Sequence, residues 1–207
     1  MSGHFITFEG IEGSGKSTQL AMAAQALRAR GRDVVTTREP GGTALGDAIR
    51  TLLLDPTQTA MHPLTEALLY AASRAQHVAE VIAPALARGV VVLCDRYADA
   101  TTAYQGAARG LSDACIQTLH GIATQQTWPQ LTLLFDLPVA VGLARAHGRA
   151  TPPDRIEQET RDFHEHVREA YRALAAREPT RVQLIDSTPS ANSIHTLVMQ
   201  WIDRYVE

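Results

Sequence analysis

The chain has 207 residues, 45% hydrophobic and 20% charged, which predicts a soluble globular protein with a sizeable core and excludes the disordered and membrane classes. A formal net charge of -3 lacks the cationic surplus that a general nucleic-acid binder needs, so no nucleic-acid partner is expected. The two cysteines, Cys94 and Cys115, have no metal-ligand spacing, which argues against a disulfide framework or a zinc site and fits a cytoplasmic protein.

Short aliphatic runs alternate with helical stretches along the chain. The predicted strands are 4–9, 33–37, 90–94, 131–135 and 182–185. The predicted helices are 16–30, 44–54, 63–88, 112–126, 139–146, 156–177 and 191–205. Because the connections are long enough for crossover helices, the pattern predicts an α/β fold: a doubly wound, five-stranded parallel sheet with helices on both faces. No linker interrupts residues 1–207, so one domain is expected. No apolar run approaches the roughly 18 residues that span a bilayer, so no membrane partner is expected.

The predicted helix 63–88 carries the longest apolar stripe. Its members recur every three or four residues, as a helix face that packs on a core requires, and they are Leu64, Leu68, Ala71, Ala75, Val78 and Ile82. We therefore expect these six side chains to be buried.

The segment GIEGSGKS begins at residue 10, follows the predicted strand FITFE and opens the next predicted helix. It matches GxxxxGK[ST] in full and lies in the strand-to-helix context that a phosphate-binding loop requires. A glycine-rich turn that matches by chance is therefore the weaker explanation. Backbone amides of such a loop cradle the β-phosphate, Lys16 is expected to bridge the β- and γ-phosphates, and Ser17 offers a hydroxyl to Mg²⁺. The residues predicted to bind ATP here are Gly10, Ile11, Glu12, Gly13, Ser14, Gly15, Lys16, Ser17 and Thr18.

A phosphate-binding loop predicts a nucleotide but not a reaction. An acidic residue at the end of a strand could complete the magnesium shell, and Asp95, Asp136 and Asp186 all follow apolar runs. All three would lie at the carboxyl edge of the sheet, where ligands bind in open α/β folds. The strand pattern alone leaves the choice among them open.

Several residues predict a second anionic ligand. Arg96 follows Asp95, and a guanidinium can grip a phosphate in bidentate fashion, although a structural ion pair is the plainer alternative. The segment TREPGGT brings Arg38 and Glu39 to the same edge. Tyr70 and Arg74 are four residues apart and share a helix face, where they could stack on a base and donate to its carbonyl, or simply face solvent.

The motifs GIEGSGKS, TREPGGT, YAASRAQH, DRYADATTAYQG and DRIE occur in the order and spacing of bacterial thymidylate kinases, and the match covers nearly the whole chain. The chain therefore resembles that family of P-loop nucleoside-monophosphate kinases. The resemblance implies transfer of the γ-phosphoryl group of ATP to dTMP with Mg²⁺, in a cytoplasmic homodimer. It also implies Ser17 and Asp95 as magnesium ligands.

The resemblance assigns roles to the remaining candidates. It implies that Glu12 contacts the 3′-hydroxyl of the acceptor sugar, Glu39 lies beside the acceptor, and Arg38 and Arg96 hold the acceptor phosphate. Tyr70 would stack on thymine and Arg74 would bond its O4. The polar edge of the base or sugar would be met by Thr101 and Gln105, with Tyr104 against the deoxyribose. Two positions depart from the usual pattern: Ser73 stands where an acid is common, and Ala100 where a serine is common.

The segment 147–153 combines glycine and two prolines with basic residues and predicts a mobile lid, which we place at about 145–157. Arginines flank or occupy it, and the resemblance makes Arg149 the leading candidate for a catalytic contact with the transferring phosphoryl group and Arg145 an ATP contact, with Arg155 the next candidate. His147 stands where an arginine is common. A solvated basic loop is the plainer alternative.

Two other functions stay open at this point. One is a kinase for another nucleoside monophosphate or a deoxynucleoside, and the other is a nucleotide-binding regulator without a transferase activity. A homodimer could use the apolar face of 63–88, which core packing explains equally well.

Overall fold

The computed structural model describes residues 3–148 and 152–206. Its five strands form one parallel sheet, as predicted. The order of the strands in the sheet is β2-β3-β1-β4-β5. The strands are β1 (Phe5–Glu9), β2 (Val34–Arg38), β3 (Val91–Asp95), β4 (Leu131–Asp136) and β5 (Val182–Asp186). Their carboxyl ends therefore meet at one edge, as the strand pattern requires.

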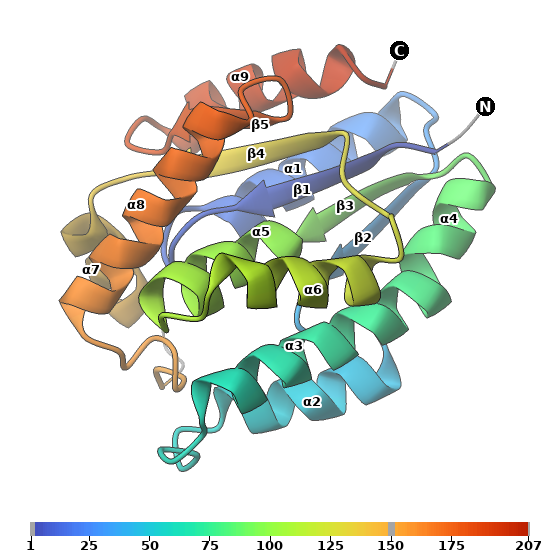
Figure 1. The fold of residues 1–207 in the computed structure, drawn as a ribbon. Helices are drawn as coiled ribbons and strands as arrows, with labels where there is room; N and C mark the ends of the chain where they lie inside the picture. Colours follow the sequence, from blue (N-terminus) through green and yellow to red (C-terminus); the bar gives the residue numbers. More distant parts are fainter. Residues whose placement is uncertain (1–2, 149–151, 207) are drawn as a thin grey trace.

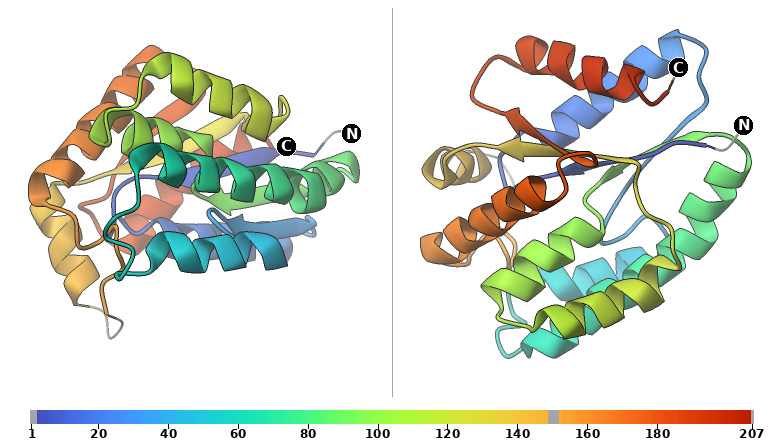
Figure 2. Two further views of the ribbon diagram at one scale, coloured as in Figure 1. Left: turned by 60° about the horizontal axis from the view of Figure 1, so that its bottom comes forward. Right: turned by 45° about the horizontal axis from the view of Figure 1, so that its top comes forward.

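Helices cover both faces of this sheet (Figures 1 and 2). On one face α1 (Lys16–Ala29) and α9 (Ala191–Asp203) pack on Ile6, Phe8 and Leu133. On the other, Phe5 packs on η1 (Val78–Ile82), and Leu134 packs among residues of η2 (Thr102–Ala108) and α8 (Arg161–Arg177). The remaining helices are α2 (Ala44–Leu54), α3 (Pro63–His77), α4 (Ala83–Ala87), α5 (Ala98–Thr101), α6 (Asp113–Thr124) and α7 (Val139–His147). The predicted doubly wound α/β architecture is confirmed.

One helix prediction needs correction, and one helix was not predicted. The helix predicted from residue 156 begins at Arg161, because Asp154 Oδ1 accepts the Ile156 and Glu157 amides in a turn and Thr160 caps the helix by accepting from the Phe163 amide. A helix formed by α5 and η2 was not predicted at all.

The predicted core stripe is also partly wrong. Val78 and Ile82 are buried, but Leu64 and Leu68 are 40% and 50% exposed. The buried face of α3 instead carries Glu66, Ala67, Ser73, Arg74 and His77. These polar side chains bond to residues around the cavity described below, so α3 turns its polar face inward and its leucines outward.

Candidate active site

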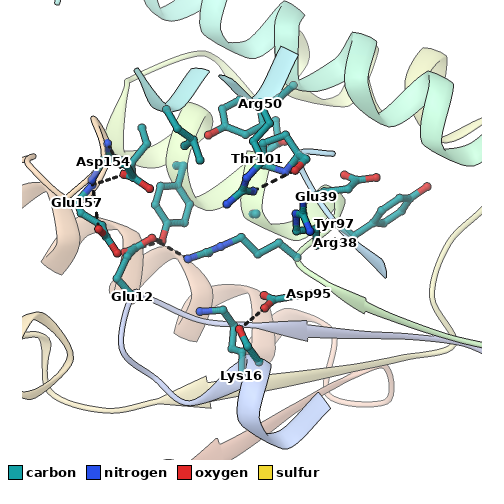
Figure 3. Close-up of a pocket in the computed structure, with 18 of the residues that line it drawn as sticks. Glu12, Lys16, Arg38, Glu39, Arg50, Asp95, Tyr97, Thr101, Asp154 and Glu157 are labelled. Atoms are coloured by element: carbon teal, nitrogen blue, oxygen red, sulfur yellow. Dashed lines mark hydrogen bonds and ion pairs between the residues drawn. The ribbon is translucent and has the colours of Figure 1, made fainter. Parts of the chain in front are cut away.

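A cavity opens at the carboxyl edge of the sheet and receives side chains from the loops after β1, β2 and β3 (Figure 3). In this view Lys16 and Asp95 lie on one side of it and Arg50 on the opposite side. The predicted residues that line it are Glu12, Gly13, Lys16, Ser17, Arg38, Glu39, Tyr70, Arg74, Asp95, Arg96, Thr101, Tyr104 and Gln105. Folding thus brings the phosphate-binding loop and the residues predicted to bind the second anionic ligand to one site.

The loop after β1 depends on glycine geometry. Gly13 has a φ of 70°, and a Cβ there would meet the Gly142 carbonyl oxygen at 2.1 Å, so only glycine fits. Lys16, which is 6% exposed, donates from Nζ to the carbonyls of Gly10 (3.0 Å) and Ile11 (2.8 Å) and to Ser14 Oγ (3.2 Å). Burial, helped by the charge of Arg96, lowers the pKa of Lys16 to about 8.

The three strand-ending aspartates differ in their partners. Ser17 Oγ donates to Asp95 Oδ2, so the side-chain oxygens of two cavity-lining residues lie together. Asp136 is paired with Arg168 and Arg172, and Asp186 accepts from Thr188 in its own turn. Hard oxygen donors suit Mg²⁺, so the Ser17–Asp95 pair fits this ion. The described part of the chain holds no cluster of three or more His, Cys, Asp or Glu residues suited to a metal.

Four arginines line the cavity and bring positive charge to it: Arg38, Arg50, Arg74 and Arg96. Arg96 donates from Nη2 to Glu12 Oε1 at 2.7 Å, and its guanidinium lies 4.9 Å from the centre of the Tyr104 ring. Arg38 pairs with Asp47, and Arg50 donates to the Pro40 carbonyl. Arg50 was not predicted, although it lies four residues after the buried Gly46 and so on the inward side of α2.

Glu12 lies at the centre of a polar network. Both of its carboxylate oxygens accept from the Tyr104 hydroxyl, at 2.8 and 3.0 Å, and His164 Nδ1 lies 3.3 Å from Oε2. Burial opposes its charge, but Arg96 and His164 hold the pKa of Glu12 well below its usual range. Glu12 is therefore an ionised acceptor at the cavity wall.

Arg74 is held by several neighbours. It is 1% exposed and donates to Glu39 Oε2 (2.8 Å), to the Tyr97 carbonyl and to Thr101 Oγ1 (both 3.0 Å). His77 Nδ1 lies 2.9 Å from the other Glu39 oxygen, Oε1. Arg74 Nη1 is buried and has no hydrogen-bond partner among the described residues. This guanidinium is thus fixed in place with one donor nitrogen uncommitted.

The two residues that depart from the usual family pattern, Ser73 and Ala100, differ in what they contribute to the site. Ser73 Oγ accepts from the Gly41 amide at 3.1 Å and so fixes the TREPGGT loop. Ala100 lines the cavity without a polar group, and its neighbour Thr101 supplies the hydroxyl to Arg74.

Glu66 is a buried acid that was not predicted from the sequence as a site residue. It contacts both Gln105 and, in the predicted lid, Arg155. Glu66 accepts from Gln105 Nε2 at 2.8 Å and pairs with Arg155 Nη2 at 2.6 Å, while Arg155 Nε donates to the Leu53 carbonyl. Arg155 is therefore a structural residue here. Arg145 donates to the Ser187 carbonyl at 3.2 Å, and Arg149 lies outside the described residues. Asp154 and Glu157 also line the cavity without having been predicted.

Within residues 3–148 and 152–206, every helix is too short or too polar to cross a membrane.

The family model and the similar proteins described here are all thymidylate kinases. The family model described as thymidylate kinase matches residues 8–198. The chain is 54% identical to the thymidylate kinase of Geobacter sulfurreducens, over 95% of this chain and 94% of the relative. It is 52% identical to that of Alcanivorax borkumensis, over 100% of this chain and 97% of the relative. The crystal structure of thymidylate kinase from Ehrlichia chaffeensis superposes with a TM-score of 0.79 at 31% identity, over 98% of this chain and 99% of that one.

Proposed function

The chain belongs to the thymidylate kinase family, and from this premise we propose that it transfers the γ-phosphoryl group of ATP to dTMP, giving dTDP and ADP. The observation that carries the proposal is the shared cavity, which is lined by the phosphate-loop Lys16, the fixed donor Arg74 and the cation Arg96. Two nucleotides must meet in one site for direct transfer, because the reaction depends mainly on alignment and on positive charge around the moving group.

On the donor side, the loop amides and Lys16 would hold the β- and γ-phosphates. Ser17 and Asp95 would hold Mg²⁺, which when bound neutralises charge on the same phosphate oxygens. The contact between Ser17 and Asp95 supports this assignment.

On the acceptor side, Arg96 with Arg38 and Arg50 would grip the dTMP phosphate and orient one of its oxygens toward the γ-phosphorus. The uncommitted Arg74 Nη1 would donate to thymine O4, and Tyr70 would stack on the ring. Glu12 would accept from the sugar hydroxyl beside Tyr104. Their lining of one cavity supports these roles.

A coupled assay of ADP release tests the function. With Mg²⁺ and ATP, ADP release should depend on dTMP and should be the fastest with dTMP in a panel of nucleoside monophosphates and deoxynucleosides. A nucleotide-binding regulator would instead release ADP at the same low rate with every acceptor, and a related kinase would prefer another member of the panel.

The lid supplies the first mutational prediction. Arg149→Ala is expected to lower kcat by roughly 10²- to 10³-fold with little change in the KM for ATP, because a cation that arrives on closure stabilises the transferring phosphoryl group more than bound ATP. Steady-state kinetics measure both constants. Arg145→Ala, in the same segment, is the matched control and should mainly raise the KM for ATP. If Arg149→Ala keeps kcat within a few-fold, the catalytic cations are Lys16 and Arg96 instead.

We also propose that the protein is a homodimer. Its support is the set of exposed leucines on the adjacent helices α2 and α3, namely Leu45, Leu52, Leu64 and Leu68, which are 40% to 54% exposed. Burying such a patch against a second copy removes apolar area from water on both chains. A cytoplasmic location and a single kinase domain with a lid at about 145–157 belong to the same proposal.

Leu68→Glu is expected to shift the protein from dimer to monomer at micromolar concentration, because it would bury two unpaired carboxylates in a symmetric interface. Sedimentation velocity measures this. Leu184→Glu is the matched control, because Leu184 is 48% exposed on β5, away from α2 and α3. Equal sedimentation of the two variants would place any interface elsewhere.

A further inference from the structure

Glu9 ends β1, is fully buried and has no role in the proposed reaction. Its Oε1 accepts from the Tyr97 amide and its Oε2 from the Tyr171 hydroxyl, both at 2.6 Å. Burial, together with the charge of Asp99, raises the pKa of Glu9 to about 8. A buried carboxyl group is costly to keep unless its bonds fix something in place.

Both partners of Glu9 are attached to Arg96. Tyr97 follows Arg96 in the chain, so the bond to the Tyr97 amide fixes the backbone just after it. Arg96 itself has a φ of 69°, a left-handed conformation that is unfavourable for a residue with a side chain, and its own amide donates to the Phe8 carbonyl at 3.0 Å. The bond from Tyr97 to Glu9 thus helps to hold a strained turn.

The second partner reaches the other end of the same arginine. Arg96 Nη1 lies 3.4 Å from the Tyr171 hydroxyl oxygen, and Tyr171 is 2% exposed on α8. Because the Tyr171 hydroxyl donates to Glu9, its oxygen is free to accept from Arg96. A second donor nitrogen of the same guanidinium, Nη2, bonds to Glu12.

We propose that Glu9 and Tyr171 are positioning residues that fix Arg96 at both its backbone and its guanidinium, and thereby set the affinity for the acceptor phosphate without touching the substrate. The inference rests on the proposed function, in which Arg96 grips the phosphate of dTMP. It concerns mainly this phosphate, because Arg74, which would meet the base, bonds directly to neither Glu9 nor Tyr171 and is connected to Glu9 only through the backbone of Tyr97.

Tyr171→Phe tests the proposal by removing a single hydroxyl. The KM for dTMP should rise by roughly 3- to 10-fold, as expected for the loss of one hydrogen bond that aligns a charged group. The KM for ATP should stay unchanged. The inhibition constant of thymidine, measured as a competitor of dTMP, should also stay unchanged because thymidine has no phosphate for Arg96 to bind.

Tyr205→Phe is the matched control, since it removes a hydroxyl that donates to the Thr180 carbonyl far from the cavity. Glu9→Gln is a second variant, assayed above pH 8, where Glu9 of the unmodified protein is ionised. Its amide oxygen can still accept from the Tyr97 amide, but its NH₂ group cannot accept from Tyr171. It should raise the KM for dTMP in the same selective way.

Three results would overturn the inference. The first is an unchanged KM for dTMP in both Tyr171→Phe and Glu9→Gln. The second is an equal weakening of dTMP and thymidine, which would indicate general damage to the pocket. The third is an unmodified protein that does not phosphorylate dTMP, which would refute the proposed function and with it the phosphate role of Arg96. In the first two cases the unmodified protein still phosphorylates dTMP, so the proposed function survives.

Discussion

Lys16→Ala is expected to lower kcat for dTMP phosphorylation by roughly 10³-fold or more, because it removes the cation that faces the β- and γ-phosphates where negative charge develops. The effect should fall on catalysis more than on the fold. Lys16 is the only lysine in the sequence, so no other ammonium group of a side chain can replace it. Steady-state assays with saturating dTMP and ATP measure the loss.

The control must separate catalysis from folding, because Lys16→Ala leaves the carbonyls of Gly10 and Ile11 without their donor. We expect a loss of about 1–3 kcal/mol in the free energy of unfolding, which is a shift of a few degrees in Tm. Arg28→Ala, on the same helix, also removes a donor to a backbone carbonyl and should keep full activity. A folded Lys16→Ala variant with most of its activity would refute the phosphate-loop assignment.

The kcat/KM for dTMP is expected to exceed that for dCMP by roughly 10⁴-fold, because a buried hydrogen-bonding group discriminates strongly against a mismatched partner. Thymine presents the O4 acceptor, whereas cytosine presents an amino donor at the same position. Arg74 is a donor with no acceptor capacity, and its contacts with Glu39 and Thr101 prevent it from turning away.

dUMP is the matched comparison for this second prediction, because uracil keeps O4 and lacks only the methyl group. A missing methyl in a pocket is worth about 1–3 kcal/mol, so dUMP should be weaker than dTMP by only roughly 10- to 200-fold. Initial rates at substrate concentrations below KM, after subtraction of ADP release without an acceptor, give kcat/KM for dTMP, dCMP and dUMP. Comparable values for dCMP and dTMP would contradict the thymine-pocket assignment.

The features that depend on adjacent residues could be predicted from the amino-acid sequence alone. The strand-loop-helix segment around residue 10 was predictable because its turns depend on its own glycines, as the positive φ angles of Gly10, Gly13 and Gly15 illustrate. The five strands were predictable because each is a short run rich in aliphatic or β-branched residues, and the three central strands, β1, β3 and β4, are almost entirely buried. The parallel sheet followed from the length of the connections. Carboxyl-edge placement of Lys16, Asp95 and Arg96 then needed no further information.

The partner of each buried polar side chain could be identified only in the folded chain. The periodicity of 63–88 located a helix but not its orientation, because burial of Glu66 and Arg74 depends on Gln105, Arg155 and Glu39 from distant segments. Arg155 resembled a lid cation until its pairing with Glu66 was known. Likewise, Asp95, Asp136 and Asp186 were equivalent as strand ends and differ only in their partners. Ion pairs between residues far apart in sequence leave no local pattern, since their energy depends on distance and burial in the folded chain.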